Sequence, residues 1–299
     1  MLGRPVKRLL VIVLALFSLA GTAAAGPAAP PISPADGPDL TLMALATTDV
    51  SGARLDGQKY VATTGTVASY QRDLVLRGRL AYLSNEVDLY ESNAAAHEDA
   101  ALIRRVLATP AGRKAFGGAF KRSLQPLRTK SITVSRPSGI SAGEFAFRFT
   151  ILAVTNRGRL HFGFAVVRLH RAVGYASVLA RPGRLVTGAD LARLARVQAE
   201  RFRTGFTVGT STPPAIVGTA VQGQTLTADR GRWLGGPELY AFQWKRCDAA
   251  GVCADIPGAT GATYFVTAAD VGYTLGVRVE GRNPLSALTV ESALTSTVT

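Results

Sequence analysis

The sequence has few of the residues on which most metal centres and enzyme active sites depend. Its 299 residues include two cysteines and three histidines, and 20 acidic residues against 34 basic ones. His161 and His170 lie nine positions apart on one expected strand, so they would face opposite sides of a sheet and could not share a metal ion. His97 precedes Glu98 but lacks the second histidine of a zinc-protease helix. We therefore expect no metal site and no cofactor.

Catalytic motifs are also scarce. The sequence shows no phosphate-binding glycine loop and no dinucleotide fingerprint, and the nearest approach to a nucleophile elbow, GTSTP at residues 209–213, lacks its closing glycine. Glu86, Asp88 and Glu91 form the only acidic cluster, and Ca²⁺ usually takes more oxygen ligands than these supply. The sequence favours a non-enzymatic protein. A secreted hydrolase assembled from distant residues of the first module stays as the alternative.

The N-terminus has the pattern of an export signal. Within residues 1–25, basic residues precede the apolar run Leu9–Ala20, and three alanines precede Gly26. The apolar run has 12 residues, whereas a membrane-spanning helix needs about 20; an uncleaved anchor is the alternative. Residues 26–38 are rich in alanine and proline and are expected to form an extended spacer. The sequence predicts a secreted protein or one of the extracytoplasmic cell envelope, with no transmembrane helix in the mature chain.

Positive charge is concentrated in one part of the chain. The net charge is +14, and residues 39–207 carry 25 basic against 12 acidic residues, whereas residues 208–299 carry 6 against 7. This asymmetry suggests two modules with different surfaces, of which the first would meet an anionic partner. The alternative is that arginine is merely the favoured soluble residue of the proteome, which the rarity of lysine in this sequence would fit.

Residues 39–207 are predicted to form an α+β module with helices laid on an antiparallel sheet. The order of elements loosely resembles the α/β/α sandwich of photosystem II extrinsic subunits and related exported actinobacterial lipoproteins. This resemblance implies a binding or scaffolding role, because most members of that superfamily are not enzymes. The expected strands are 69–76, 82–90, 131–135, 144–155, 160–173 and 175–179, and the expected helices begin at Asn93, Pro110 and Thr187.

Residues 104–130 of this module include eight basic residues and no acidic residue. On a helix, Lys114 and Lys121 would share a face opposite Phe116 and Phe120, with a break at Gly117–Gly118. Such a surface could dock an anionic envelope polymer or lipid head groups. Nucleic acid is unlikely, because export separates the protein from it and no base-stacking aromatics are interleaved. The alternative is a solvated helix face. The candidate anion-binding residues are Arg104, Arg105, Arg113, Lys114, Lys121, Arg122, Arg128 and Lys130.

After an expected linker at residues 208–212, residues 213–299 show a strand–turn rhythm with no helix signal. Five motifs closely resemble the immunoglobulin-like (Ig-like) repeat of exported actinobacterial proteins: PPAIVGTAVQGQTL from Pro213, GRW ending at Trp233, YAFQWKRC ending at Cys247, IPGAT ending at Thr260, and ADVGYTLGVRV ending at Val279. The resemblance implies an all-β sandwich of seven strands. Trp244 would be its central aromatic, facing an inner stripe of Tyr273, Leu275, Val277 and Val279.

The two cysteines, Cys247 and Cys253, both lie in this second module with five residues between them. In an oxidising compartment such an isolated pair is expected to form a disulfide that closes a small hairpin ring. A metal site would need two further ligands, and none is nearby. The function expected from the sequence is thus that of an exported binding or structural protein, whose ligand and oligomeric state the sequence does not identify.

Overall fold

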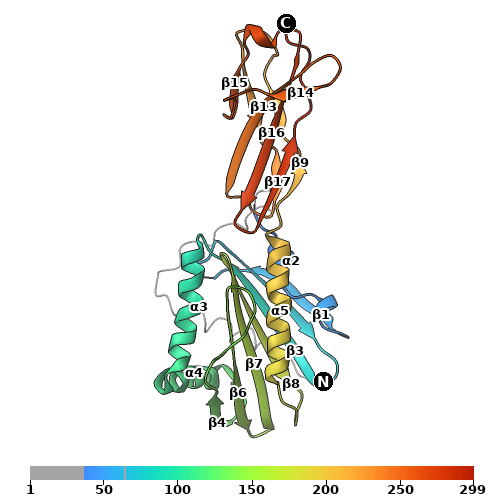
Figure 1. Ribbon diagram of the computed structural model, residues 1–299. Coiled ribbons are helices and arrows are strands. Elements are labelled where there is room, and N and C mark those ends of the chain that lie inside the picture. Colours follow the sequence, from blue (N-terminus) through green and yellow to red (C-terminus); the bar gives the residue numbers. More distant parts are fainter. Residues whose placement is uncertain (1–36, 64) are drawn as a thin grey trace. The chain divides into compact units, whose positions relative to one another are not determined.

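The computed structural model describes residues 37–63 and 65–299, and these divide into two compact units (Figure 1). The first unit comprises Leu40–Thr204, and the second comprises residues 37–39 together with Gly205–Thr299. The expected signal peptide and most of the spacer lie outside the described residues. Both units are built mainly from antiparallel strands, with few helices, as the β-rich sequence pattern predicts.

The first unit contains one antiparallel sheet whose strands follow the order β1-β2-β3-β8-β7-β6-β4, with β5 also paired to β6. Strand β1 was not among the expected strands, because its residues are mostly exposed and show no alternation of apolar and polar side chains. The bounds are β1 Arg54–Val61, β2 Ala68–Val75, β3 Leu80–Leu89, β4 Thr129–Val134, β5 Ser138–Gly139, β6 Phe145–Thr155, β7 Gly158–Leu169 and β8 Ala172–Ala180.

A hairpin turn divides the segment that was expected to be a single strand over residues 160–173. Strand β7 ends at Leu169, and His170 and Arg171 connect it to β8. His170 has a φ of 51°, in the left-handed region that most residues avoid. The prediction that His161 and His170 share a strand is therefore wrong. The turn was missed because its sequence contains none of the usual turn-forming residues.

Helices cover both faces of this sheet. Helices α3 (Asn93–Ala108) and α4 (Pro110–Ser123) pack on one face, where Phe120 lies edge-on to Phe162 with ring centroids 5.0 Å apart. Helix α5 (Gly188–Gly205) packs on the other face, on the same side as the short α2 (Leu40–Met43). Its close approach requires Gly163, where an added Cβ would lie 2.9 Å from Leu191 of α5 and 2.4 Å from Val186 just before the helix.

The helix starts follow the expected capping chemistry with one correction. Ser92, and not Asn93, caps α3, since its side chain accepts a hydrogen bond from the Ala95 amide. Thr187 and Asp190 exchange the reciprocal hydrogen bonds of a capping box at the start of α5, as expected.

Helix α4 runs without a break through its two glycines, so the expected interruption at Gly117–Gly118 is wrong. Gly117 is buried, and an added Cβ there would lie 3.2 Å from Ile132 and 3.3 Å from Val134 of β4. The absence of a side chain lets α4 lie close against the edge strand of the sheet. This contact places the end of α4 beside the start of β4.

The second unit consists of sandwich-like sheets of two, three and four strands around a core that includes Trp233 and Trp244. The segment expected as a linker contains strand β9, which pairs with β12. Tyr273 is 39% exposed and lies before β16, so its predicted place in the inner stripe is wrong, whereas Leu275, Val277 and Val279 are buried. The bounds are β9 Gly209–Thr212, β10 Ala215–Val217, β11 Thr225–Asp229, β12 Arg232–Leu234, β13 Leu239–Cys247, β14 Cys253–Asp255, β15 Thr263–Phe265, β16 Thr274–Asn283 and β17 Ser286–Glu291.

Candidate anion-binding site

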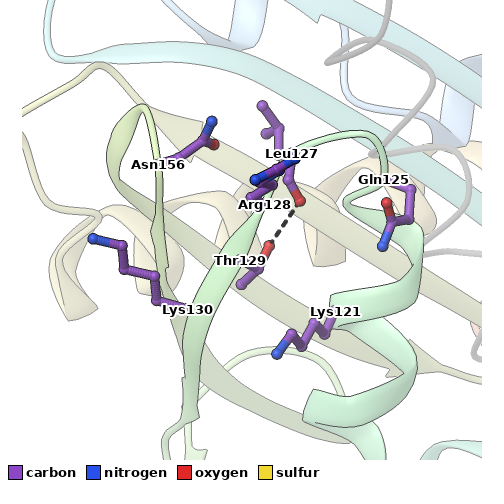
Figure 2. Close-up of a pocket in the computed structure, with 7 residues that line it drawn as sticks. All are labelled: Lys121, Gln125, Leu127, Arg128, Thr129, Lys130 and Asn156. Carbon is purple, nitrogen blue, oxygen red and sulfur yellow. Dashed lines mark hydrogen bonds between the residues drawn. The ribbon is translucent and has the colours of Figure 1, made fainter.

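Three of the eight basic candidates converge on one pocket of the first unit. The pocket has a volume of about 520 Å³ and lies where the end of α4, the loop that follows it, the start of β4 and the β6–β7 turn meet (Figure 2). Its described lining residues are Lys121, Gln125, Leu127, Arg128, Thr129, Lys130 and Asn156.

Hydrogen bonds to backbone carbonyls hold the parts of the pocket together. The Asn156 amide donates to the Arg128 carbonyl at 2.9 Å, which fixes the β6–β7 turn against the loop. The Thr129 hydroxyl donates to the Leu127 carbonyl at 3.4 Å, and the Leu127 amide donates to the carbonyl of the fully buried Leu124 at 2.9 Å. The pocket is thus formed by segments that the fold itself anchors.

Lys130 occupies an irregular position in β4. Thr129 pairs with Thr155 and Ser131 pairs with Val154, so Lys130 is the extra residue of a β-bulge. A bulge changes the direction of a side chain relative to the regular pleat. Here Lys130 is exposed on an edge strand and lines the pocket, while Ile132 and Val134 of the same strand pack on the core.

The electrostatic character of this pocket is positive. Lys121, Arg128 and Lys130 are exposed, and among the described residues none of them forms an ion pair with a carboxylate. The side-chain amides of Gln125 and Asn156 add neutral donors. Such a set can bind a phosphate, sulfate or carboxylate group through charge-assisted hydrogen bonds.

The other five basic candidates do not line this pocket. Arg113 donates to the carbonyls of Leu107 and Ala108 at the end of α3, and Arg104 lies over the Phe145 ring at 5.4 Å, so these two stabilise the fold. Arg105, Lys114 and Arg122 are exposed on α3 and α4. The sequence could not have identified Asn156 as a pocket residue, because only the tertiary fold brings it to the basic segment, which itself contains Gln125.

A second group of polar residues is an acidic layer on β2, β3 and α3. Of the predicted acidic cluster, Glu91 is exposed, while Glu86 and Asp88 are buried on β3. The fold adds Asp73 of β2 and Asp99 of α3. Burial raises the pKa of Glu86 and, more strongly, that of Asp88, whose pKa the neighbouring Glu86 charge raises further. Their alternate positions on β3 were the only sequence signal for this layer.

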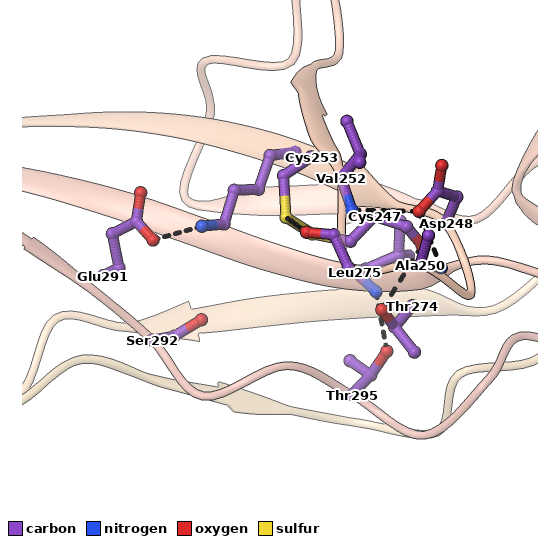
Figure 3. The surroundings of a disulfide bond; sticks show 12 residues. Cys247, Asp248, Ala250, Val252, Cys253, Thr274, Leu275, Glu291, Ser292 and Thr295 are labelled. Atoms are coloured by element: carbon purple, nitrogen blue, oxygen red, sulfur yellow. Dashed lines mark hydrogen bonds and ion pairs between the residues drawn. A yellow bond between two sulfur atoms is a disulfide. The ribbon is translucent and has the colours of Figure 1, made fainter.

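The predicted disulfide between Cys247 and Cys253 is confirmed (Figure 3). The two residues face each other across β13 and β14, and Cys247 is buried while Cys253 is exposed. The Asp248 carboxylate accepts hydrogen bonds from the amides of Ala250 and Val252, both at 2.9 Å, and thereby orders the hairpin between the cysteines.

Two further features concern metal binding and membrane crossing, for the described residues only. Among them, no group of three or more histidine, cysteine, aspartate or glutamate side chains is arranged to hold a metal ion. None of the helices in this part of the chain combines the length and apolar character that a membrane crossing requires.

Comparison with known proteins gives a few partial likenesses. No protein-family model matches the chain. The 187-kDa microtubule-associated protein AIR9 of Arabidopsis thaliana is 34% identical over 65 residues, which are 22% of this chain and 4% of that protein. The extracellular domain of PknH from Mycobacterium tuberculosis aligns with 54% of this chain and 93% of its own, at 11% identity and a TM-score of 0.35. The chain is therefore similar to one short segment of a much longer protein and distantly similar to one solved domain.

Proposed function

We propose that the chain is an exported, non-enzymatic binding protein of the cell envelope, and that its first unit binds a polyanion through the pocket around Lys121, Arg128 and Lys130. The observation that carries this proposal is the convergence of three cations from a helix, a loop and a strand, none of them paired with a described carboxylate. The phosphate groups of an envelope polymer or of lipid head groups fit this chemistry.

Exposed lysines on an edge strand have a second explanation, since charge there discourages pairing with another chain. Lys130 meets that description, because β4 ends the order of the sheet. Protection of an edge strand does not account for Lys121 at the end of α4 or for Arg128 in the loop. The gathering of all three at one concave surface supports a binding role.

We further propose that the first unit has the α+β architecture of the photosystem II extrinsic-subunit superfamily and that the second unit is an Ig-like module serving as spacer or adhesive domain. Helices on both faces of the antiparallel sheet support the first assignment. The buried Trp244 on β13, opposite the buried Val277 of β16, supports the second. The disulfide supports an oxidising compartment outside the cytoplasm.

A pair of matched variants tests the anion site. K121Q/R128Q/K130Q removes three positive charges from the pocket, and R105Q/K114Q/R122Q removes three exposed charges that do not line it. Each protein is sedimented with phosphatidylcholine vesicles that contain or lack phosphatidylglycerol, and is separately titrated with a soluble poly(glycerol phosphate).

We expect the wild-type chain to bind at least one of the two phosphate-bearing probes, with an affinity that falls as salt is added. The pocket variant should bind at least tenfold more weakly, and the control variant within about threefold of wild type. Equal losses in both variants would show that only net charge matters, and would overturn the assignment of the pocket.

A further inference from the structure

The basic pocket belongs to a longer basic surface at one end of the sheet. The strand pairings bring the β2–β3 turn, the end of β8, the β6–β7 turn and the start of β4 to the same end. The starts of β3 and β4 are four strand spacings apart, which is about 19 Å. Outside the pocket, this end carries six exposed arginines: Arg77, Arg79, Arg157, Arg159, Arg181 and Arg184. Together with the three cations of the pocket, they form the basic end of the first unit.

Acidic side chains are nearly absent from the segments that form the basic end. Residues 76–80, 121–131, 155–160 and 181–187 contain no aspartate or glutamate. Asp190 at the start of α5 pairs with Arg79. Among the described residues, the other five arginines of the basic end form no ion pair with a carboxylate. The basic end therefore keeps a positive charge along its length, which attracts an extended anionic surface.

An exposed leucine lies within this basic end. Leu185 is 60% exposed, more than any other large apolar side chain described in the first unit, and it follows Arg184 in the loop between β8 and α5. A single exposed leucine is common on protein surfaces and by itself indicates nothing. Its place among cations gives it meaning, because attachment to a bilayer surface strengthens with both buried apolar area and attraction to anionic lipids.

Hydrogen bonds fix the loop that carries Leu185. The Arg181 amide donates to the Arg79 carbonyl at 3.0 Å, and the Arg79 guanidinium donates to the Leu185 carbonyl. At the next residue, the Val186 amide donates to His161 Nδ1 at 2.9 Å, and the Val186 side chain is buried. The backbone around Leu185 is thus anchored to the sheet while its side chain stays exposed.

The exposed leucine distinguishes between the two phosphate-bearing partners that the proposed function allows. A soluble phosphate polymer can contact the cations of the basic end, but it is hydrophilic and offers no apolar region to Leu185. A lipid bilayer presents phosphate groups in a plane and acyl chains directly beneath them. Cations spread over about 19 Å, with an anchored apolar side chain in the same surface, match that arrangement.

We propose that the basic end docks on the surface of an anionic lipid bilayer, with lipid phosphates in the pocket and Leu185 inserted at the boundary between head groups and acyl chains. This inference rests on the proposed function, because the pocket supplies part of the contact, and it selects lipid head groups over a soluble polymer as the partner. The exposed Arg77 and Arg184 extend the contact beyond the pocket.

A matched pair of leucine variants separates docking on a bilayer from binding of a small anion. L185N removes the exposed side chain of the basic end, and L239N is the control, because Leu239 is 58% exposed on β13 of the second unit. Each purified chain is sedimented with vesicles of phosphatidylcholine and phosphatidylglycerol. Each is also titrated with tripolyphosphate and with a soluble poly(glycerol phosphate).

We expect L185N to bind the vesicles at least fivefold more weakly than the wild type, because it loses apolar contact. Its affinity for tripolyphosphate should stay within twofold of wild type, since the pocket is unchanged. L239N should match the wild type with every probe.

A second pair of variants tests the arginines outside the pocket. R77Q/R184Q removes two charges of the basic end, and R232Q/R282Q removes two exposed charges of the second unit as the control. R77Q/R184Q should bind the vesicles at least threefold more weakly and keep its affinity for tripolyphosphate. The control should stay within twofold of wild type with both probes.

Fluorescence quenching tests the insertion of residue 185 directly. Both native tryptophans, Trp233 and Trp244, are completely buried in the second unit, so the added emission of L185W or L239W reports on the substituted position. Vesicles whose acyl chains carry bromine should quench the added emission of L185W at least threefold more strongly than that of L239W.

The outcomes separate failure of the docking surface from failure of the pocket. Vesicle binding by L185N equal to that of the wild type, or quenching in L185W no stronger than in L239W, would overturn the docking proposal. Binding of poly(glycerol phosphate) without binding of vesicles would also overturn it, while leaving the pocket as the anion site. If the wild type bound none of the three probes, the proposed function would fail and the docking surface with it.

Discussion

At the scale of single residues, Asp88 combines deep burial with a pKa that burial raises well above its ordinary value. It is almost wholly buried on β3, with Glu86 two residues before it and Asp99 nearby. Desolvation penalises its charged form, so the folded state keeps a proton that the unfolded state loses near pH 4. The contribution is fully present below the unfolded pKa and is lost as the pH rises through the folded pKa.

Replacing this carboxyl removes the penalty. Asp88→Asn should stabilise the first unit by about 1–3 kcal/mol at pH 8, because burial and the neighbouring Glu86 penalise the charged form of the wild-type carboxyl. The gain should be smaller at pH 5, because the cost of taking up a proton on folding decreases as the pH falls toward the unfolded pKa near 4. Urea denaturation at both pH values measures this difference. A gain of equal size at both would contradict the raised pKa.

The basic pocket shows what single residues of the sequence could and could not predict. Lys121, Arg128 and Lys130 were expected to bind anions because they belong to an uninterrupted basic run. Arg113 belongs to the same run, yet it donates to the last carbonyls of α3. The order of charged residues in the sequence does not distinguish a cation that binds an anion from one that donates to the end of a helix. That difference depends on which backbone carbonyls the fold places near each side chain.

At the scale of secondary-structure elements, the glycine pair of α4 has two separate roles. Gly117 faces β4, where it allows close packing, whereas an added Cβ at Gly118 would meet nothing within 4 Å. Glycine in an exposed helix interior costs about 1 kcal/mol relative to alanine. The two positions are neighbours in one helix, so each serves as the other's control.

Gly118→Ala should therefore stabilise the first unit by about 0.5–1 kcal/mol. Gly117→Ala should stabilise the first unit less than Gly118→Ala does, or should destabilise it, because the added methyl group would press on Ile132 and Val134. Thermal unfolding of both variants measures the difference. A larger gain for Gly117→Ala would show that α4 does not pack on β4 as described.

The elements of the first unit were predictable where their patterns are strong. Strand β6 alternates Phe147, Phe149 and Ile151 on the buried face, and the sequence predicts it within one residue at its start. Strand β1 has no apolar alternation because most of its residues are exposed, so periodicity did not reveal it. The turn at His170 lacks glycine, proline and asparagine, and only the pairing of β7 with β8 identifies it.

At the scale of the whole molecule, the chain combines two units with different means of stabilisation. The first unit has a core of phenylalanines and tyrosines between the sheet and α3 and α4. The second unit is smaller, and its core around Trp233 and Trp244 is supplemented by the disulfide. We therefore expect the units to respond differently to reduction.

Replacing both cysteines should lower the stability of the second unit and leave the first unchanged. For so small a ring, the loss in Cys247→Ser/Cys253→Ser should be about 2 kcal/mol. Differential scanning calorimetry resolves the two transitions, and treatment of the wild type with a reductant should reproduce the shift. A shift confined to the transition of the first unit would contradict this assignment.

The most direct test of the anion site locates a bound phosphate by NMR. On titration with tripolyphosphate, the amide resonances of Lys121, Thr129, Lys130 and Asn156 should shift together and saturate, while those around Arg105 and Lys114 stay in place. In K121Q/R128Q/K130Q these shifts should disappear. Shifts spread evenly over all exposed basic residues, or centred on α3, would contradict the account.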